Sequence, residues 1–395
     1  MPEFLPFRAT RHAPRLAAEV GRLWAPPYDV LSAEDRARLA ARHPRNVVHV
    51  DVPVADAGVA DRYAAAAARL RGWIAEGTLV TDDAPSYTIV RTSFVDPSGR
   101  ARTTLGVMGA LRIEAPDDPG VRPHERTTPK DSTDRLELTR ATRANLSPVW
   151  GLSLAAGLTG ALVEPGTLVG EATDDDGVVH RYERVDDPAR VAAIAAVASS
   201  ATIVIADGHH RYAVSRAYRD EAGAPEGARH VLTHLGELVE EQLAVAAIHR
   251  LYAGVTPGAL EAALAASFAC REMGDLPDDA IARMASDGHL TLVRADGSAV
   301  ALTPRSGAFP GVRDLDSARL EHALSALPHE VSYQHGVREV RARLAAGGHA
   351  AAVLIRPVGV AEIARTAREG VLMPPKSTFF TPKLRTGPVL RLLDA

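Results

Sequence analysis

Five consecutive residues, Asp207-Gly208-His209-His210-Arg211, are the strongest candidates for chemistry in this sequence. They follow residues 201–206 (ATIVIA), whose apolar and β-branched side chains predict a short buried strand. Residues 212–220 then predict a helix. A glycine turn at a helix N-terminus offers free backbone N–H groups to an anion, and the arginine and histidines add further donors.

Asp207 narrows the kind of anion that this turn would bind. A carboxylate repels a phosphate unless a cation lies between them, so Asp207 indicates a Mg²⁺ ion as well as a phosphate group. Asp207 and His209 are therefore candidate catalytic residues, with Asp207 also the candidate metal ligand. Gly208, His210 and Arg211 are candidate contacts to the bound phosphates. An ordinary strand–helix turn, with solvated polar residues, is the alternative interpretation.

A second polar stretch, RPHERT (122–127), lies in a proline-bounded loop before a predicted polar helix. We take Glu125 as a candidate general base beside His124, with the positive charge of Arg126 or Lys130 controlling its protonation. His124 and Arg126 are also candidate substrate contacts. A solvated, salt-bridged loop and helix would explain the same residues. Sequence alone does not bring Glu125 next to Asp207.

The third stretch, residues 373–385 (MPPKSTFFTPKLR), closes the chain. Rigid proline segments that carry Lys376, Ser377, Lys383 and Arg385 suit a loop that lays donors on a phosphate. The two phenylalanines within it indicate that the segment is docked, although a basic tail can also be merely solvated.

Near the N-terminus, PPYDV (26–30) predicts a rigid loop in which Tyr28 and Asp29 can line a substrate pocket. A purely structural turn explains these residues equally well. Ser32 is a good helix start because acidic residues follow it in the first turn. Residues 47–52 (VVHVDV) are predicted to form a strand.

The length of 395 residues, with 46% hydrophobic and 24% charged residues, is typical of a globular protein of two or three packed units. Alternating strand and helix patterns predict an α/β (α+β) fold with mixed sheets. We expect an N-terminal α/β region over 1–252 that contains the DGHHR turn. A C-terminal α/β region over 253–395 would return its final loop, 372–385, to the site.

Composition also limits the partners. The single cysteine, Cys270, excludes an intramolecular disulfide and a cysteine-based zinc site, and it favours the cytoplasm. No apolar run approaches the ~20 residues that span a bilayer, and the first residues show no signal-peptide pattern. A net charge of −4 gives no overall attraction to nucleic acid, so we expect no nucleic-acid partner and any anion site must be local. The oligomeric state stays open, with a homodimer as one option.

Taken together, these stretches resemble the bacterial and archaeal family catalogued as domain of unknown function 1015. The resemblance runs nearly end to end and is carried by five motifs: PPYDV (26–30), RPHERT (122–127), NLSP (145–148), ADGHHRY (206–212) and MPPKSTFFTPKLR (373–385).

The DGHHR pentapeptide is also similar to the phosphate-binding motif of the ParB/sulfiredoxin-like nucleotide-binding fold. That fold includes CTP-hydrolysing partition proteins and free L-serine kinases. The resemblance implies that residues 207–211 hold Mg²⁺ and the phosphates of a nucleotide (ATP, ADP or CTP). It also implies that Glu125, in an HE sequence like that of the kinases, accepts the proton of a serine hydroxyl.

The motifs are compatible with three functions. The first is a Mg²⁺-dependent kinase that phosphorylates the hydroxyl of a free amino acid, with L-serine as the first substrate to test. The second is a ParB-like switch protein that hydrolyses CTP or ATP, although no helix-turn-helix or basic stripe supports DNA binding. The third is a metal-dependent hydrolase that would use histidines and carboxylates, with His249 as an additional ligand.

Overall fold

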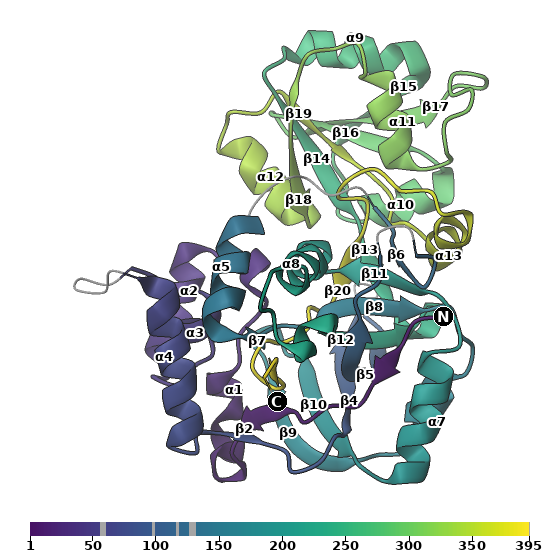
Figure 1. Ribbon diagram of the computed structural model, residues 1–395. Helices are drawn as coiled ribbons and strands as arrows, with labels where there is room; N and C mark the ends of the chain where they lie inside the picture. Colours follow the sequence, from purple (N-terminus) through teal and green to yellow (C-terminus); the bar gives the residue numbers. More distant parts are fainter. Residues whose placement is uncertain (56–60, 97–98, 116–117, 126–131, 395) are drawn as a thin grey trace. The chain divides into compact units, whose positions relative to one another are not determined.

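The computed structural model describes residues 1–55, 61–96, 99–115, 118–125 and 132–394. It contains two compact units. Unit 1 comprises Met1–Ala244 and Pro382–Ala395, and unit 2 comprises Val245–Thr381. The mixture of sheets and helices confirms the α/β fold class (Figure 1). The expected division at 252/253 remains a prediction about domains.

A nine-stranded mixed sheet is the framework of unit 1. Its strands, in spatial order, are β6 (Val121–Pro123), β11 (Ile203–Asp207), β8 (Val149–Ser153), β12 (His230–Glu237), β5 (Ala101–Arg112), β4 (Tyr87–Val95), β10 (Val179–Val185) and β9 (Thr167–Thr173), with β1 (Phe4–Leu5) pairing with β5. β4 and β5 form the predicted antiparallel hairpin. Two further pairs complete the strands of the unit: β2 (Thr10–His12) with β3 (Leu79–Thr81), and β7 (Ala144–Asn145) with β21 (Arg391–Leu392).

The helices of unit 1 pack on this framework. They are α1 (Val20–Leu23), α2 (Ala33–Arg42), α3 (Val48–Asp51), α4 (Arg62–Ala75), α5 (Ser132–Thr142), α6 (Leu158–Leu162), α7 (Pro188–Ala198) and α8 (His209–Arg219). Figure 1 shows α2, α3, α4 and α5 gathered at one end of the unit, where Leu39, Val48, Leu70 and Leu138 share one buried cluster. α5 also packs against α8, so this helical group reaches the DGHHR turn.

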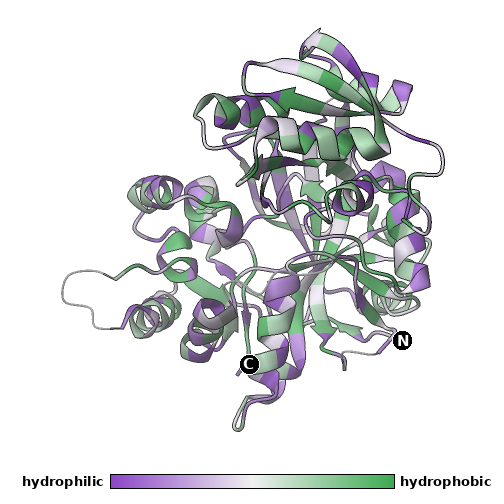
Figure 2. Cartoon of the chain, turned by 90° about the horizontal axis from the view of Figure 1, so that it is seen from above, coloured by the Kyte–Doolittle hydropathy of each residue, from purple (hydrophilic) through white to green (hydrophobic). Residues whose placement is uncertain are grey.

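Unit 2 contains a six-stranded antiparallel sheet. Its strands are β15 (Phe268–Asp275), β17 (Ser298–Pro304), β16 (Leu290–Arg294), β19 (Ala351–Leu354), β14 (Ile248–Ala253) and β18 (Glu330–His335). Its helices are α9 (Pro257–Ser267), α10 (Ala280–Asp287), α11 (Asp316–Ala323), α12 (Val337–Ala345) and α13 (Val360–Glu369). β13 (Ala244–Ala246) pairs with β20 (Phe379–Thr381) where the chain changes units. Within each unit the helices carry both purple and green segments in Figure 2, as amphipathic helices with one buried side do.

One element of the structure differs from the sequence prediction. Residues 47–52 were predicted to be a strand, but α3 (Val48–Asp51) is a single helical turn. The Asn46 side chain favours the turn, because its oxygen accepts a hydrogen bond from the backbone N–H of Val48 at 2.9 Å. The predicted helix start at Ser32 is confirmed, since Ser32 and Asp35 form a reciprocal capping box.

Candidate functional site

The direction of three neighbouring strands brings the predicted site residues to one edge of the sheet. β6 and β11 are parallel, so His124 and Asp207, at or just after their carboxyl ends, lie at the same edge. β8 runs antiparallel to β11, and its residue Trp150 is the register partner of Asp207. The NLSP segment (145–148) therefore leads into β8 at this edge. Loops at the carboxyl ends of strands are common ligand sites in α/β folds.

The turn between β11 and α8 has the geometry that the DGHHR sequence predicts. Gly208 has φ = +82°, a conformation that favours glycine. A Cβ atom at this position would lie 3.1 Å from the guanidinium carbon of Arg211 and 3.3 Å from the Cα atom of Val149. α8 begins directly afterwards, at His209, so the first backbone N–H groups of the helix lie at the sheet edge.

Asp207 is held between two cations. Its Oδ2 atom accepts a hydrogen bond from the Lys383 ammonium at 3.0 Å and lies 3.6 Å from Nη2 of Arg211. Its Oδ1 atom accepts one from the backbone N–H of Gly208 at 2.9 Å. Burial alone would raise the pKa of Asp207, but the charges of Lys383 and Arg211 hold it well below its usual range. Asp207 is therefore a carboxylate at neutral pH.

Arg211 is buried and binds other parts of the protein. It donates hydrogen bonds to the backbone carbonyl of Pro148 and, at 3.2 Å, to Oδ2 of Asp29. Its guanidinium also lies over the Tyr28 ring, 5.9 Å from the ring centre. Burial would lower the pKa of Arg211, but Asp29 and Asp207 raise it above its usual value. Arg211 thus connects the PPYDV, NLSP and DGHHR motifs.

His124 joins the second motif to this edge. Its Nδ1 atom lies 2.6 Å from the carbonyl oxygen of Ile205, which only accepts, so Nδ1 carries the proton. The rings of His124 and His209 are 5.1 Å apart, and Nε2 of His124 is 3.7 Å from Oε2 of Glu125. Burial lowers the pKa of His124, against the opposing charges of Glu125 and Asp207. His124 is therefore held neutral by burial while it interacts with the charges of Glu125 and Asp207.

The remaining predicted residues are not all brought to this place. His210 lies in the first turn of α8. Arg385 lies 3.6 Å from Asp174, which also contacts His180, so Arg385 belongs to a different ion-pair cluster. Arg126 and Lys130 lie outside the described residues.

Two C-terminal candidates, Lys376 and Ser377, belong to unit 2, as does His249. Ser377 is fully buried there and donates a hydrogen bond to the carbonyl of Pro374. Lys376 is exposed. The backbone N–H of Ile355 donates to Nδ1 of His249 at 3.3 Å, which gives this histidine a structural partner within its own unit.

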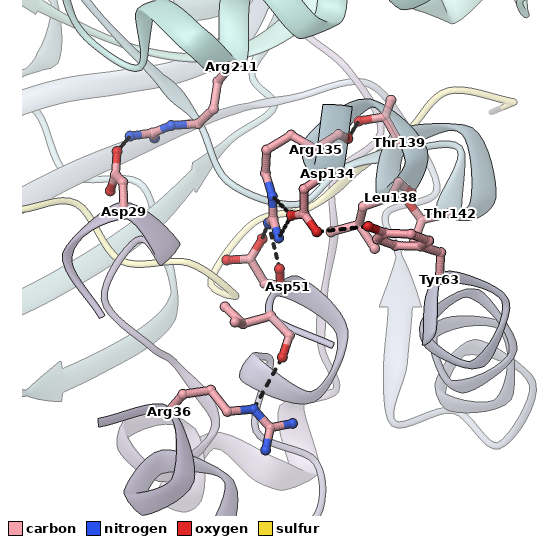
Figure 3. A network of polar contacts seen from close by, with 11 residues as sticks. Asp29, Arg36, Asp51, Tyr63, Asp134, Arg135, Leu138, Thr139, Thr142 and Arg211 are labelled. Atoms are coloured by element: carbon pink, nitrogen blue, oxygen red, sulfur yellow. Dashed lines mark hydrogen bonds and ion pairs between the residues drawn. The ribbon is translucent and has the colours of Figure 1, made fainter. Parts of the chain in front are cut away.

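Sequence reasoning missed two residues beside the site, Asp51 and Arg135. Figure 3 shows Arg135 between Asp51 and Asp134, with its guanidinium directed at both. Tyr28 joins this network to the site, because the Arg135 guanidinium lies 4.3 Å from the centre of its ring. Asp51 carries no sequence signal, because the VVHVDV pattern predicts a strand.

The donor set limits how a metal can bind. Within the described residues, no group of three or more His, Cys, Asp or Glu side chains is arranged to hold a metal ion. Asp207 offers one carboxylate, already paired with Lys383. That set fits Mg²⁺ when the ion arrives with a nucleotide, because phosphates and water then supply most of its ligands. Among the described helices, none is long and apolar enough to cross a membrane.

Several solved structures are similar to this chain at low identity. A conserved hypothetical protein from Pyrococcus furiosus is 13% identical with a TM-score of 0.40, over 70% of this chain and 93% of that chain. A free serine kinase variant in complex with ADP is 12% identical with a TM-score of 0.41, over 70% and 90%. SbnI with a C-terminal truncation, from Staphylococcus aureus, is 13% identical with a TM-score of 0.40, over 72% and 87%.

No curated protein matches the chain. A family model does match, and it covers residues 4–318, which include the PPYDV, RPHERT, NLSP and DGHHR segments. Its description is "Protein of unknown function (DUF1015)". The chain therefore belongs to the DUF1015 family.

Proposed function

We propose that this protein is a Mg²⁺-dependent kinase that transfers the terminal phosphoryl group of a nucleotide to the hydroxyl of a free amino acid, with L-serine as the first substrate to test. The observation that carries the proposal is the arrangement around Asp207. A carboxylate, a lysine and a helix N-terminus meet at one edge of the sheet, next to the His124–Glu125 pair. Phosphoryl transfer requires positioning and neutralisation of charge more than covalent chemistry.

The nucleotide phosphates would lie at the N-terminus of α8. The backbone N–H groups after Gly208 and the side chains of His209 and His210 would donate to phosphate oxygens. Lys383 would exchange its bond to Asp207 for a bond to the transferred group. Bound Mg²⁺, with Asp207 as its protein ligand, would neutralise the phosphate charge.

The acceptor hydroxyl would approach from the side of Glu125. Its oxygen forms a bond to the terminal phosphorus, the bond from that phosphorus to the nucleotide breaks, and the proton passes to Glu125. His124 would position Glu125, since its own Nδ1–H group is fixed on Ile205. Arg211, which already binds Asp29 and the carbonyl of Pro148, would reach a phosphate oxygen in place of Asp29.

The test is a product screen. The purified protein is incubated with Mg²⁺, with ATP, ADP or CTP in turn, and with a set of hydroxy amino acids that includes L-serine. Mass spectrometry then identifies any phosphorylated acceptor. We expect phosphoserine from the wild type and a loss of at least ~100-fold in rate for both Asp207→Asn and Glu125→Gln. Turnover that is unchanged in Asp207→Asn would contradict the proposal.

The same screen separates the other two functions. Nucleotide hydrolysis without a phosphorylated acceptor would favour the ParB-like switch. Zinc or manganese held stoichiometrically by the purified protein would favour the metal-dependent hydrolase.

A further inference from the structure

We propose that a pocket bordered by α3, α5 and α8 binds the protonated amino group of the acceptor amino acid through Asp51. This inference rests on the proposed function and deepens it, because it assigns the part of the site that selects an amino acid over other hydroxyl compounds. The pocket has a volume of about 50 Å³ and lies wholly within unit 1.

Asp51 is the residue that points to a ligand. Only 2% of it is exposed. Arg135 donates to the backbone carbonyl of Asp51 at 2.6 Å and lies 3.4 Å from its Oδ1 atom (Figure 3). The Oδ2 atom is buried and has no hydrogen-bond partner among the described residues. A buried carboxylate oxygen without a donor is costly, so it indicates a missing partner.

Arg135 does not neutralise Asp51 by itself. The same guanidinium donates two hydrogen bonds to Oδ2 of Asp134, at 2.9 and 2.7 Å, so its charge is shared between two carboxylates. Burial raises the pKa of Asp51, while Arg135 opposes that shift. A cationic donor next to Oδ2 would favour the charged form, and an ammonium group supplies both a positive charge and N–H donors.

The pocket is suited to a small polar molecule. Besides Asp51 and Arg135 it is lined by Tyr28, Arg211 and several short polar side chains, among them Thr139, Asn145, Ser147 and Ser215. Its volume holds a few water-sized groups, which is enough for the head of an amino acid and too little for a nucleotide base.

Arg211 connects this pocket to the phosphate site. It lines the pocket, and its Nη2 atom is 3.6 Å from Oδ2 of Asp207. A molecule whose ammonium group contacts Asp51 would therefore direct its other end towards the transferred phosphoryl group. Recognition of the amine and reaction at the hydroxyl would then use adjacent groups of one site.

Calorimetric binding tests the inference with three probes: L-serine, ethanolamine, and 3-hydroxypropionate, which is serine without its amino group. The wild type is expected to bind both amines and to bind 3-hydroxypropionate roughly 10- to 100-fold more weakly than L-serine. Asp51→Asn should lose that preference and keep its nucleotide affinity. Asp316→Asn is the matched control, because Asp316 is also buried and paired with an arginine, Arg356, but lies in unit 2.

The outcomes separate this inference from the kinase proposal. Binding of the amines without formation of phosphoserine would leave the pocket assigned and reject the kinase. Equal affinity for L-serine and 3-hydroxypropionate in the wild type, an unchanged preference in Asp51→Asn, or no binding of either amine would overturn the inference. A thermal melt of Asp51→Asn checks folding, because asparagine keeps the shape of the side chain and an oxygen that can face Arg135.

Discussion

At the scale of single residues, the site depends on the charge state of Asp207. Its carboxylate accepts hydrogen bonds from the Lys383 ammonium and the Gly208 N–H group, and it forms an ion pair with the Arg211 guanidinium. Together they outweigh the effect of burial and lower its pKa. Asp207 is therefore a carboxylate over the whole physiological pH range. In the proposed kinase, a metal–nucleotide complex would displace Lys383 from it.

Lys383→Met tests this electrostatic arrangement through stability. We expect a loss of about 2 kcal/mol in the free energy of unfolding near pH 7. Because the folded-state pKa of Asp207 is lowered, its contribution to stability is present above the unfolded-state value of about 3.9 and disappears as the pH falls through the folded-state value. The difference between wild type and variant should therefore shrink in acid.

Urea denaturation between pH 7 and pH 2 measures that difference. Lys376→Met serves as the control, because Lys376 is exposed and should change stability little at any pH. An equal loss at pH 7 and pH 2 for Lys383→Met would show that its ammonium does not act through Asp207.

At the scale of elements, the turn between β11 and α8 depends on Gly208. An alanine there meets two costs: the positive φ of +82° and the short contacts of its Cβ atom with Arg211 and Val149. Gly208→Ala is expected to lower stability by about 2–3 kcal/mol and to disturb the N-terminus of α8.

Gly223 provides a matched control for this substitution. Its φ is +81°, but a Cβ atom there would have no neighbour within 4 Å. Gly223→Ala should therefore show only the conformational cost, about 1 kcal/mol. Chemical denaturation of both variants measures the comparison, and equal losses would mean that close packing against Arg211 and Val149 is unimportant.

The elements differ in how well the sequence predicts them. The strand–DGHHR–helix element was predicted correctly because its signals are local: a β-branched run, a glycine and an amphipathic helix. α3 is not predicted, because a short apolar run such as VVHVDV does not distinguish a strand from a helix, and the side-chain hydrogen bond from Asn46 that favours the turn has no clear signal in the sequence. The sequence likewise does not identify Asp51 as a candidate site residue, because Asp51 is buried among residues that are distant from it in the sequence.

The C-terminal cations show a related limit. Lys383 and Arg385 are two positions apart in the sequence, and both are equally good candidates for binding a phosphate. In the structure Lys383 contacts Asp207, whereas Arg385 lies near Asp174. The choice depends on which partner each side chain meets across the fold, and neither composition nor spacing specifies that. The assignment of both residues to phosphate binding stays a prediction.

At the scale of the whole molecule, unit 1 is built from both ends of the chain. Residues 382–395 return to it, where β21 pairs with β7 and where Val389, Leu390 and Leu393 are buried. A chain that ends at Thr381 loses these contacts together with Lys383. Because each buried aliphatic side chain contributes roughly 1.5–3 kcal/mol, we expect the thermal midpoint of unit 1 to fall by more than about 10 °C.

Circular dichroism melts of the truncated and complete chains measure this loss. A chain lacking only the last two residues is the control, because it removes one exposed ion pair between Asp394 and Arg143, which contributes little. A truncated chain that melts like the complete one would show that the C-terminal segment is not an integral part of unit 1.

Phosphorus NMR of one reaction mixture follows the proposed phosphoryl transfer itself. Protein, Mg²⁺, L-serine and the nucleotide selected by the product screen are combined, and spectra are collected over time. A kinase gives a new phosphomonoester resonance that grows as the terminal phosphate resonance of the nucleotide declines, and we expect this resonance to be absent with Asp207→Asn. Growth of inorganic phosphate alone, or a spectrum that does not change, would contradict the assignment of the DGHHR turn to a kinase active site.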